Sequence, residues 1–277
     1  YLSGAFGLGQ ASRNLIDIIK NITPNNSLYD ITEFSGHKKE KEYFKNIETA
    51  NFKEQHEADY LIIMANEDQI PKLINKNCSK LFRKANKKIA YWWWETEDFP
   101  TRWIYNSFYF DEIWVATNFI KHSLEKIIPI PVKVIPLPLK NKEPQKKKKG
   151  KKQKNILTIF DSFSYIDRKN PQGVIEAFKK AVNKSLDKKY LHLTIKAINM
   201  KTNEEKSLRK NLEGYYYTII NKKISEQEMD DLMNEADIFI SLHRTEGLGL
   251  NIINAILMEK PVIASNYSGN TEFMTKN

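Results

Sequence analysis

Short apolar runs alternate along the chain with longer stretches in which apolar residues recur every three or four positions. Apolar runs of this length are typical of strands buried on both faces, whereas the three-to-four spacing is typical of helices. The pattern predicts strands at 59–65, 87–94, 111–117, 132–139, 155–160, 191–198, 215–220, 237–243 and 261–265. Strands of this kind, separated by helices, indicate parallel sheets covered on both sides.

Start signals place the helices between these strands. A proline at the first helical position, an N-cap threonine and a capping box are all present before amphipathic stretches. The predicted helices begin at Pro71, at 118 after the N-cap Thr117, at Pro171, after the pair Ser225 and Glu228, and near Leu248.

A lysine-rich stretch interrupts the alternation, which then restarts. Nine lysines and Glu143 lie between Lys140 and Lys154 and carry +8 of the net charge of +10. Mutual repulsion favours an extended, solvated linker, with attraction to anionic lipid headgroups as the alternative. We therefore predict a Rossmann-like domain over 1–140, a linker over 141–154 and a second Rossmann-like domain over 155–277, both incomplete at the chain ends.

Composition limits the class of protein. A hydrophobic content of 41% excludes wholesale disorder, and the single cysteine, Cys78, excludes an intrachain disulfide and fits a reducing compartment. No uninterrupted apolar stretch of about 18 residues and no signal peptide are visible in the sequence. These features favour a globular, cytoplasmic protein.

Three segments carry candidate chemistry, the first of them "GAFGLGQASR" at 4–13. Gly7 and Gly9 are expected at a strand-to-helix turn, where the backbone can approach a ligand and helix N–H groups face an anion. A tight turn that only packs is the alternative. As a dinucleotide motif the segment is weak, because Ser12 stands in the third glycine position.

The second segment, "FDSFSYIDRKNPQG", places Arg168 and Lys169 directly before a predicted helix. Two fixed cations beside a helix N-terminus suit a diphosphate. The alternative is that the two cations form a solvated corner. This alternative is less favoured, because the polar residues that end the preceding strand could line the same site: Asp161, Ser162 and Ser164.

The third segment, "SLHRTEGLGLNIIN", places Glu246 before two glycines at the start of a helix. A carboxylate held there is a good acceptor for sugar hydroxyls. Asn254 lies about two helical turns further on, and His243 ends the preceding strand beside the loop.

Together with "YWWWETEDFP" and "FDEIWVATNFIKHSL", these segments resemble the retaining glycosyltransferases of family 4. The resemblance covers nearly the whole chain in the expected order and is to bacterial, polysaccharide-building, mannosyltransferase-like members. It implies the GT-B fold, an α/β architecture in which two Rossmann-like domains face each other across a cleft.

The resemblance also implies roles for individual residues. Glu246, Lys169 and Arg168 match catalytic positions, and Glu95 loosely matches an acceptor-side position. Asn254 replaces the second acid of the family motif, and Ser164 stands where an arginine is usual. The implied donor-binding residues are Gly7, Gly9, Ser162, His243, Gly247, Leu248, Gly249 and Asn254.

The implied reaction transfers a sugar from a GDP- or UDP-linked donor to a glycan or lipid-linked acceptor in bacterial surface polysaccharide synthesis. No metal and no other cofactor are expected, and nucleic acid is not an expected partner, since only the lysine run favours it. Peripheral contact with the inner face of the membrane stays open. The rival hypothesis is a degenerate, non-catalytic relative that binds nucleotide sugar or glycan.

Overall fold

The computed structural model describes residues 2, 7–23, 25–32, 48–51, 57–140, 142, 144 and 153–274. The chain divides into two compact units, the first over Tyr1–Lys140 and the second over Asn141–Met274. Each unit holds its own parallel sheet. In the described part of the chain, no helix has the length and apolar character needed to cross a membrane.

Unit 1 contains a four-stranded sheet in the order β1-β2-β3-β4, with every neighbouring pair parallel. Its strands are β1 (Ala58–Ile63), β2 (Ala85–Tyr91), β3 (Glu112–Val115) and β4 (Val132–Val134). Its helices are α1 (Gly7–Ile22), α2 (Ile70–Leu73), α3 (Ser79–Lys84), α4 (Ile104–Ser107) and α5 (Asn118–Glu125), with short 3-10 turns at Glu67–Gln69 and Thr101–Trp103.

Local sequence signals explain several of these boundaries. Thr117 caps α5 as predicted, accepting a hydrogen bond from the backbone N–H of Ile120. The helix predicted from Pro71 is interrupted instead, because a π-helical turn over Ile74–Cys78 separates α2 from α3. β2 ends at Tyr91, so the three tryptophans predicted on this strand follow it. Trp92 is nevertheless fully buried, against Phe99 and Phe110.

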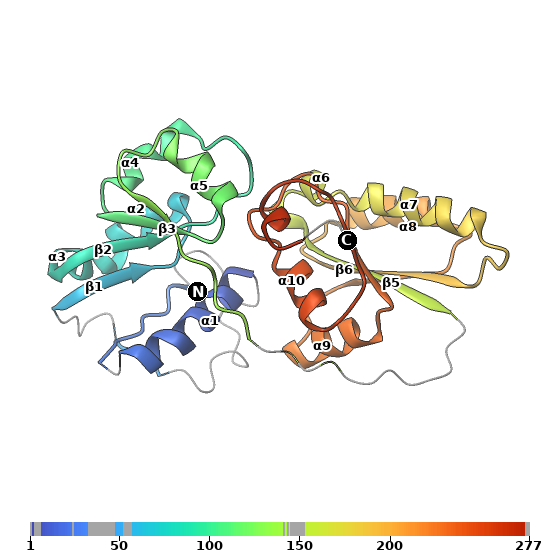
Figure 1. Ribbon diagram of the computed structural model, residues 1–277, viewed down its shortest axis with the longest axis horizontal. Helices are drawn as coiled ribbons and strands as arrows, with labels where there is room; N and C mark the ends of the chain where they lie inside the picture. Colours follow the sequence, from blue (N-terminus) through green and yellow to red (C-terminus); the bar gives the residue numbers. More distant parts are fainter. Residues whose placement is uncertain are drawn as a thin grey trace. The chain divides into compact units, whose positions relative to one another are not determined.

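Unit 2 contains a five-stranded parallel sheet, shown with its helices in Figure 1. Its strands are β5 (Lys154–Asp161), β6 (Leu191–Ile198), β7 (Tyr217–Asn221), β8 (Ile238–Ser241) and β9 (Val262–Ala264). Its helices are α6 (Ile166–Lys169), α7 (Pro171–Lys184), α8 (Thr202–Asn211), α9 (Glu226–Glu235) and α10 (Leu250–Leu257), with 3-10 turns η6 (Ser162–Ser164) and η7 (Gly269–Glu272).

The strand order in unit 2 is β7-β6-β5-β8-β9. The chain therefore moves outward from β5 in one direction and then returns to add β8 on the other side of β5. This reversal is the topological switch point of a doubly wound sheet, and ligands bind at the carboxyl ends of the strands that flank it. The loops after β5 and β8 meet there.

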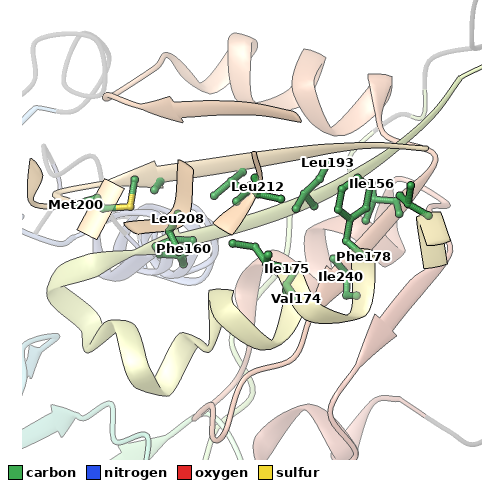
Figure 2. Packing of buried hydrophobic residues seen from close by; sticks show 13 residues of the cluster. Ile156, Phe160, Val174, Ile175, Phe178, Leu193, Met200, Leu208, Leu212 and Ile240 are labelled. Atoms are coloured by element: carbon green, nitrogen blue, oxygen red, sulfur yellow. The ribbon is translucent and has the colours of Figure 1, made fainter. Parts of the chain in front are cut away.

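Apolar side chains cover both faces of the unit 2 sheet. Figure 2 shows one core, in which Phe160 and Leu193 from the sheet pack with Ile175 and Phe178 of α7 and with α8. A second core holds Leu157 of β5 together with residues of α9 and α10. Figure 1 accordingly shows α7 and α8 on one side of β5 and β6, with α9 and α10 on the other.

The predicted fold class is confirmed, and most element boundaries differ by a few residues. β6 has the predicted range, and the Ser225–Glu228 capping box is present at α9. Most apolar runs form shorter strands than predicted; for example, β4 stops at Val134, β8 covers four residues, and β7 begins only at Tyr217. α10 covers Leu250–Leu257, within the predicted 248–259.

The predicted linker is described only at residues 142, 144, 153 and 154. Lys142 forms a salt bridge with Asp230 of α9 and its side chain is 11% exposed, so this lysine is not the solvated charge that was predicted. Lys154 belongs to β5 and pairs with Asp237. The run at 145–152 lies outside the described residues.

Candidate active site in the second unit

The loop after β5 carries the two predicted cations on a short helix, α6. Its start and end are set by two residues with left-handed backbone, Tyr165 at φ 61° and Asn170 at φ 51°. Such angles are unfavourable for a tyrosine and accumulate at functional sites. Between Tyr165 and Asn170 the chain forms a single helical turn, which carries Arg168 and Lys169.

Asn170 fixes the junction between α6 and α7. Its side-chain oxygen accepts a hydrogen bond from the N–H of Gly173 at 3.1 Å, which caps α7, and its amide donates to the carbonyl of Leu242 at 2.8 Å. One side chain therefore ties the loop after β5 to the end of β8 and sets the position of α6 relative to the loop after β8.

Glu246, in the loop after β8, lies against both cations. Its Oε1 is 2.5 Å from Lys169 Nζ and 3.3 Å from Arg168 Nη1. Arg168 is held in place by donating to the carbonyls of Ser164 and Thr245. The three ionic side chains are between 8% and 16% exposed, so solvent screens this cluster only weakly.

Protonation of this cluster follows from its charges. Burial by itself raises the pKa of Glu246, but the neighbouring charges of Lys169 and Arg168 outweigh burial and hold the pKa below its ordinary value. Glu246 is therefore ionised at neutral pH. The cluster then carries one negative and two positive charges, a net positive charge at the carboxyl edge of the sheet.

A third loop, after β9, clamps the backbone around Glu246. The N–H of Glu246 donates to Ser268 Oγ at 2.8 Å, and the N–H of Gly269 donates to the carbonyl of Glu246 at 2.9 Å. The approach is so close that a Cβ on Gly269 would lie 1.9 Å from the carbonyl oxygen of Gly247. Only glycine fits at position 269.

Gly249 turns the same loop into α10. Its φ of 88° lies in the left-handed region, and it is the N-cap of the helix without a side-chain capping bond. Backbone N–H groups at such a helix start are available to an anion. Gly247 and Leu248 are buried beside it, and the half-buried Asn254 lies one turn into α10.

Two other predicted donor residues contact protein groups in this structure. Ser162 donates from Oγ to Glu204 Oε2 at 2.8 Å, which links η6 to α8. His243 is 2% exposed, and its ring nitrogens lie 3.0 Å from Ser241 Oγ and 2.9 Å from Asn270 Oδ1. His243 therefore supports the loops from inside rather than presenting a nitrogen to the surface.

The remaining predicted residues, Gly7, Gly9 and Glu95, belong to unit 1. Gly7 and Gly9 lie within the first turn of α1, so the prediction that they form the turn before a helix is wrong at these positions. Of the segment before them, which was predicted to end a strand, only Leu2 is among the described residues, and it lies in a turn. Glu95 follows β2 at the carboxyl edge of its sheet and is half-buried.

Sequence reasoning missed the residues that assemble the site. Asn170, Ser268, Gly269 and Asn270 hold the loops together through contacts with residues far away in the sequence. The segment "NYSGNTEF" is rich in turn residues, and that was its only local signal. Arg244 was also given no role, although its backbone N–H and its Nε donate to the carbonyls of Arg168 and Asp167.

The described residues contain no group of three His, Cys, Asp or Glu side chains placed to hold a metal ion. The charged groups at the edge of the unit 2 sheet are instead a buried acid and two cations on facing loops. A cluster with net positive charge at the switch point of a doubly wound domain has the charge and the position that suit a phosphorylated ligand.

Residues 141–277, which contain the second unit, match the family described as glycosyl transferases group 1. No curated protein matches the chain. The solved structures that resemble it have the two-domain GT-B fold, and this chain has that fold as well.

Three of these structures illustrate the likeness. S. aureus TarM, solved with Fondaparinux, alpha-GlcNAc-glycerol and UDP, is 18% identical with a TM-score of 0.60, and the match covers 79% of this chain and 43% of TarM. A glycosyltransferase from Rickettsia africae is 16% identical with a TM-score of 0.58 and coverages of 79% and 60%. The pneumococcal O-GlcNAc transferase GtfA, solved with UDP and GlcNAc, is 15% identical with a TM-score of 0.54 and coverages of 78% and 44%. The chain therefore spans about half of the length of these proteins.

Proposed function

We propose that the protein is a glycosyltransferase that moves a sugar from a nucleotide-sugar donor to a saccharide acceptor. The observation that carries this proposal is the Lys169–Glu246–Arg168 cluster at the switch point of a domain that matches the glycosyl transferases group 1 family. TarM and GtfA were both solved with UDP, which supports a nucleoside diphosphate as the group bound here.

In the proposed reaction, the bond between the sugar carbon and the diphosphate breaks, and its electron pair goes to the phosphate oxygen. Arg168, Lys169 and the N–H groups at the start of α10 stabilise the charge that develops on this oxygen. The acceptor hydroxyl forms the new bond to the sugar and passes its proton to the departing diphosphate oxygen. Lys169 has three donor positions and can contact phosphate while keeping its bond to Glu246.

We assign Glu246 to the donor sugar and Asn254 to the donor ribose. The carboxylate of Glu246 is ionised and held by two cations, so it can accept hydrogen bonds from sugar hydroxyls without changing its charge. Asn254 keeps both a donor and an acceptor for ribose hydroxyls but lacks the charge-assisted component of a second acid.

The finer description follows from the family resemblance of the sequence. It comprises retention of configuration, membership of family 4, independence from metal ions, a GDP- or UDP-linked donor and a glycan or lipid-linked acceptor in bacterial surface polysaccharide synthesis. Gly7, Gly9 and Glu95 remain candidates for acceptor or donor contact from unit 1. A cytoplasmic location, with peripheral contact at the inner face of the membrane, is part of the same proposal.

The test is sugar transfer from UDP- and GDP-linked donors to saccharide acceptors, with the anomeric configuration of the product determined by NMR. Wild-type protein is expected to transfer with retention, while Lys169→Ala and Glu246→Ala lose activity. Glu213→Ala is the matched control, since Glu213 is exposed in the same unit. Wild-type transfer rates in both site variants would overturn the assignment of these residues.

A second candidate function is a non-catalytic relative that binds nucleotide sugar or glycan without turnover, and the observation that favours it is Asn254. The variant Asn254→Glu separates the two. A large gain in transfer supports degeneration of an ancestral enzyme, whereas an unchanged rate shows that asparagine is sufficient.

A further inference from the structure

A groove with a volume of about 340 Å³ lies in unit 2, between α6, the start of α7 and α8. Asp167 and Ile166 of α6 line it, whereas the next two residues of the same helix, Arg168 and Lys169, contact Glu246. The groove and the ion cluster therefore both use α6 but take different residues from it. We call this feature the α6–α8 groove.

Arg244 and Asp167 connect the groove to the ion cluster. Arg244 lines the groove and directly precedes Thr245 and Glu246, and Asp167 directly precedes Arg168. The backbone N–H of Arg244 donates to the carbonyl of Arg168 at 2.8 Å, and its Nε donates to the carbonyl of Asp167 at 3.0 Å. Two chain segments thus present one set of side chains to the groove and another to the cluster.

The charge of the groove argues against a phosphate. Its ionisable lining residues are Asp167, Glu204 and Arg244, a formal net charge of −1. The ion cluster, with Lys169 and Arg168 against Glu246, has the opposite net charge. An anionic group therefore prefers the cluster, and the charge of the groove suits an uncharged or a cationic ligand.

The remaining lining has the composition that recognises hydroxyl groups. The carboxylates of Asp167 and Glu204 accept hydrogen bonds, Arg244 donates them, and Asn203 and Ser207 can do both. Glu204 is already oriented, because its Oε2 accepts from Ser162 Oγ and from the N–H of Lys201.

Apolar atoms complete the lining. Ile166, Pro171 and Leu208 give it a non-polar surface for the C–H face of a sugar ring. Among the described residues, no aromatic side chain lines the groove for a nucleobase to stack on. The volume lies at the lower end of the range for small-molecule sites, which is enough for a short saccharide.

We propose that the α6–α8 groove is a second carbohydrate site, which binds a neutral saccharide separately from the nucleotide-sugar donor. It allows the domain to hold part of a glycan chain outside the reaction centre. Because Arg244 and Asp167 adjoin the ion cluster, occupation of the groove changes nucleotide affinity, and nucleotide changes saccharide affinity by the same factor.

The test uses the full chain labelled with 15N and followed by NMR. The probes are methyl α-glucoside, methyl α-mannoside and N-acetylglucosamine, their trisaccharides, and separately UDP and spermidine. At least one neutral saccharide is expected to shift the backbone amides of 166–173 and 203–208. Ser207→Trp fills the groove and is expected to weaken this binding by at least about tenfold.

Lys206→Trp is the matched control, because Lys206 precedes Ser207 on α8 but does not line the groove. It should retain saccharide binding, and both variants should bind UDP within about twofold of wild type. Binding of UDP without any saccharide shift in the groove overturns this proposal and leaves the proposed function standing. Binding of spermidine alone, or loss of UDP binding in Ser207→Trp, overturns it as well, because the groove is then a cation site or part of the donor site.

Discussion

The variant Glu246→Gln tests the ion cluster most sharply, because it removes one charge and keeps the shape of the side chain. Lys169 Nζ and Arg168 Nη1 lie 2.5 Å and 3.3 Å from Glu246 Oε1. With an effective dielectric constant of about 20, each attraction at such a distance is on the order of 5 kcal/mol, before the desolvation of the ions is subtracted. Removing one partner of a buried pair typically costs about 3–5 kcal/mol, because the remaining charges stay buried.

Such a loss is a large part of the stability of a domain, which is about 5–15 kcal/mol. The chain offers a built-in reference for measuring it, since all five tryptophans, at positions 92, 93, 94, 103 and 114, lie in unit 1. In urea titrations, far-ultraviolet circular dichroism follows both units, whereas tryptophan fluorescence follows unit 1. Glu246→Gln should add an early dichroism transition and leave the fluorescence midpoint in place.

The effect has a defined pH dependence. The folded-state pKa of Glu246 lies below its ordinary value of 4.5, so the folded state binds fewer protons than the unfolded state near that pH. The stabilisation is present above pH 4.5 and is lost as the pH falls through the folded-state pKa. The difference between wild type and Glu246→Gln should therefore be full at pH 7 and shrink in acid. A dichroism curve at pH 7 that matches the control Glu213→Gln would refute the reasoning.

Three further predictions follow from other parts of the chain. Gly269→Ala should destabilise unit 2 by about 1–3 kcal/mol and abolish nucleotide binding, because its Cβ would meet the carbonyl of Gly247 at 1.9 Å. The control is Gly214→Ala, at a position with open space around it and a φ of +82°, which should leave nucleotide binding intact in calorimetry. Glu67 is 2% exposed, and burial raises its pKa to about 8. The free energy of unfolding of the wild type should therefore fall by up to about 1.4 kcal/mol per pH unit between pH 4.5 and 8. Urea titrations of Glu67→Gln should lack this fall, and equal slopes for the two proteins would contradict the burial argument. Asn170→Ala should destabilise unit 2 by about 1–2 kcal/mol through loss of the α7 cap. Asn170→Gly should lose less stability, because glycine adopts the left-handed φ of this position without strain. Equal losses in thermal unfolding would show that backbone strain has no part in the effect.

The sequence predicts helices and strands well where interactions between neighbouring residues determine them. The Leu- and Ile-containing run of β6 and the proline and apolar stripe of α7 agree with the structure, because burial on both faces and helix periodicity can be read from a few neighbouring residues. Tyr215 and Tyr216 show the limit. They continue an apolar run, yet β7 begins only at Tyr217, because strand ends depend on pairing with β6.

The site shows the same division. Arg168, Lys169 and Glu246 could be selected from the sequence, since cations before a helix and an acid before glycines are local signals. Their mutual contact could not, because it depends on loops 77 residues apart that meet only once β8 pairs with β5. The support given by Ser268 and Gly269 was hidden for the same reason.

The direction of the His243 side chain is another feature that the sequence did not show. Its place at the end of a strand beside the glycine loop suggested contact with a ligand, but the side chain turns inward and bonds with Asn270. Successive side chains of a strand point to opposite faces of the sheet, so an error of one residue in the expected strand position exchanges a ligand contact for a core contact. Sequence position alone does not resolve such a shift at a strand end.

The most direct test of the central claim is calorimetric titration of UDP, GDP and ADP, and of their sugar conjugates, into wild-type protein and Lys169→Met at two salt concentrations. We expect base-selective binding to wild type that persists at the higher salt, and a loss of at least about tenfold in Lys169→Met. Equal affinity of wild type and Lys169→Met for every nucleotide would contradict the claim that the Lys169–Glu246–Arg168 cluster binds the donor diphosphate.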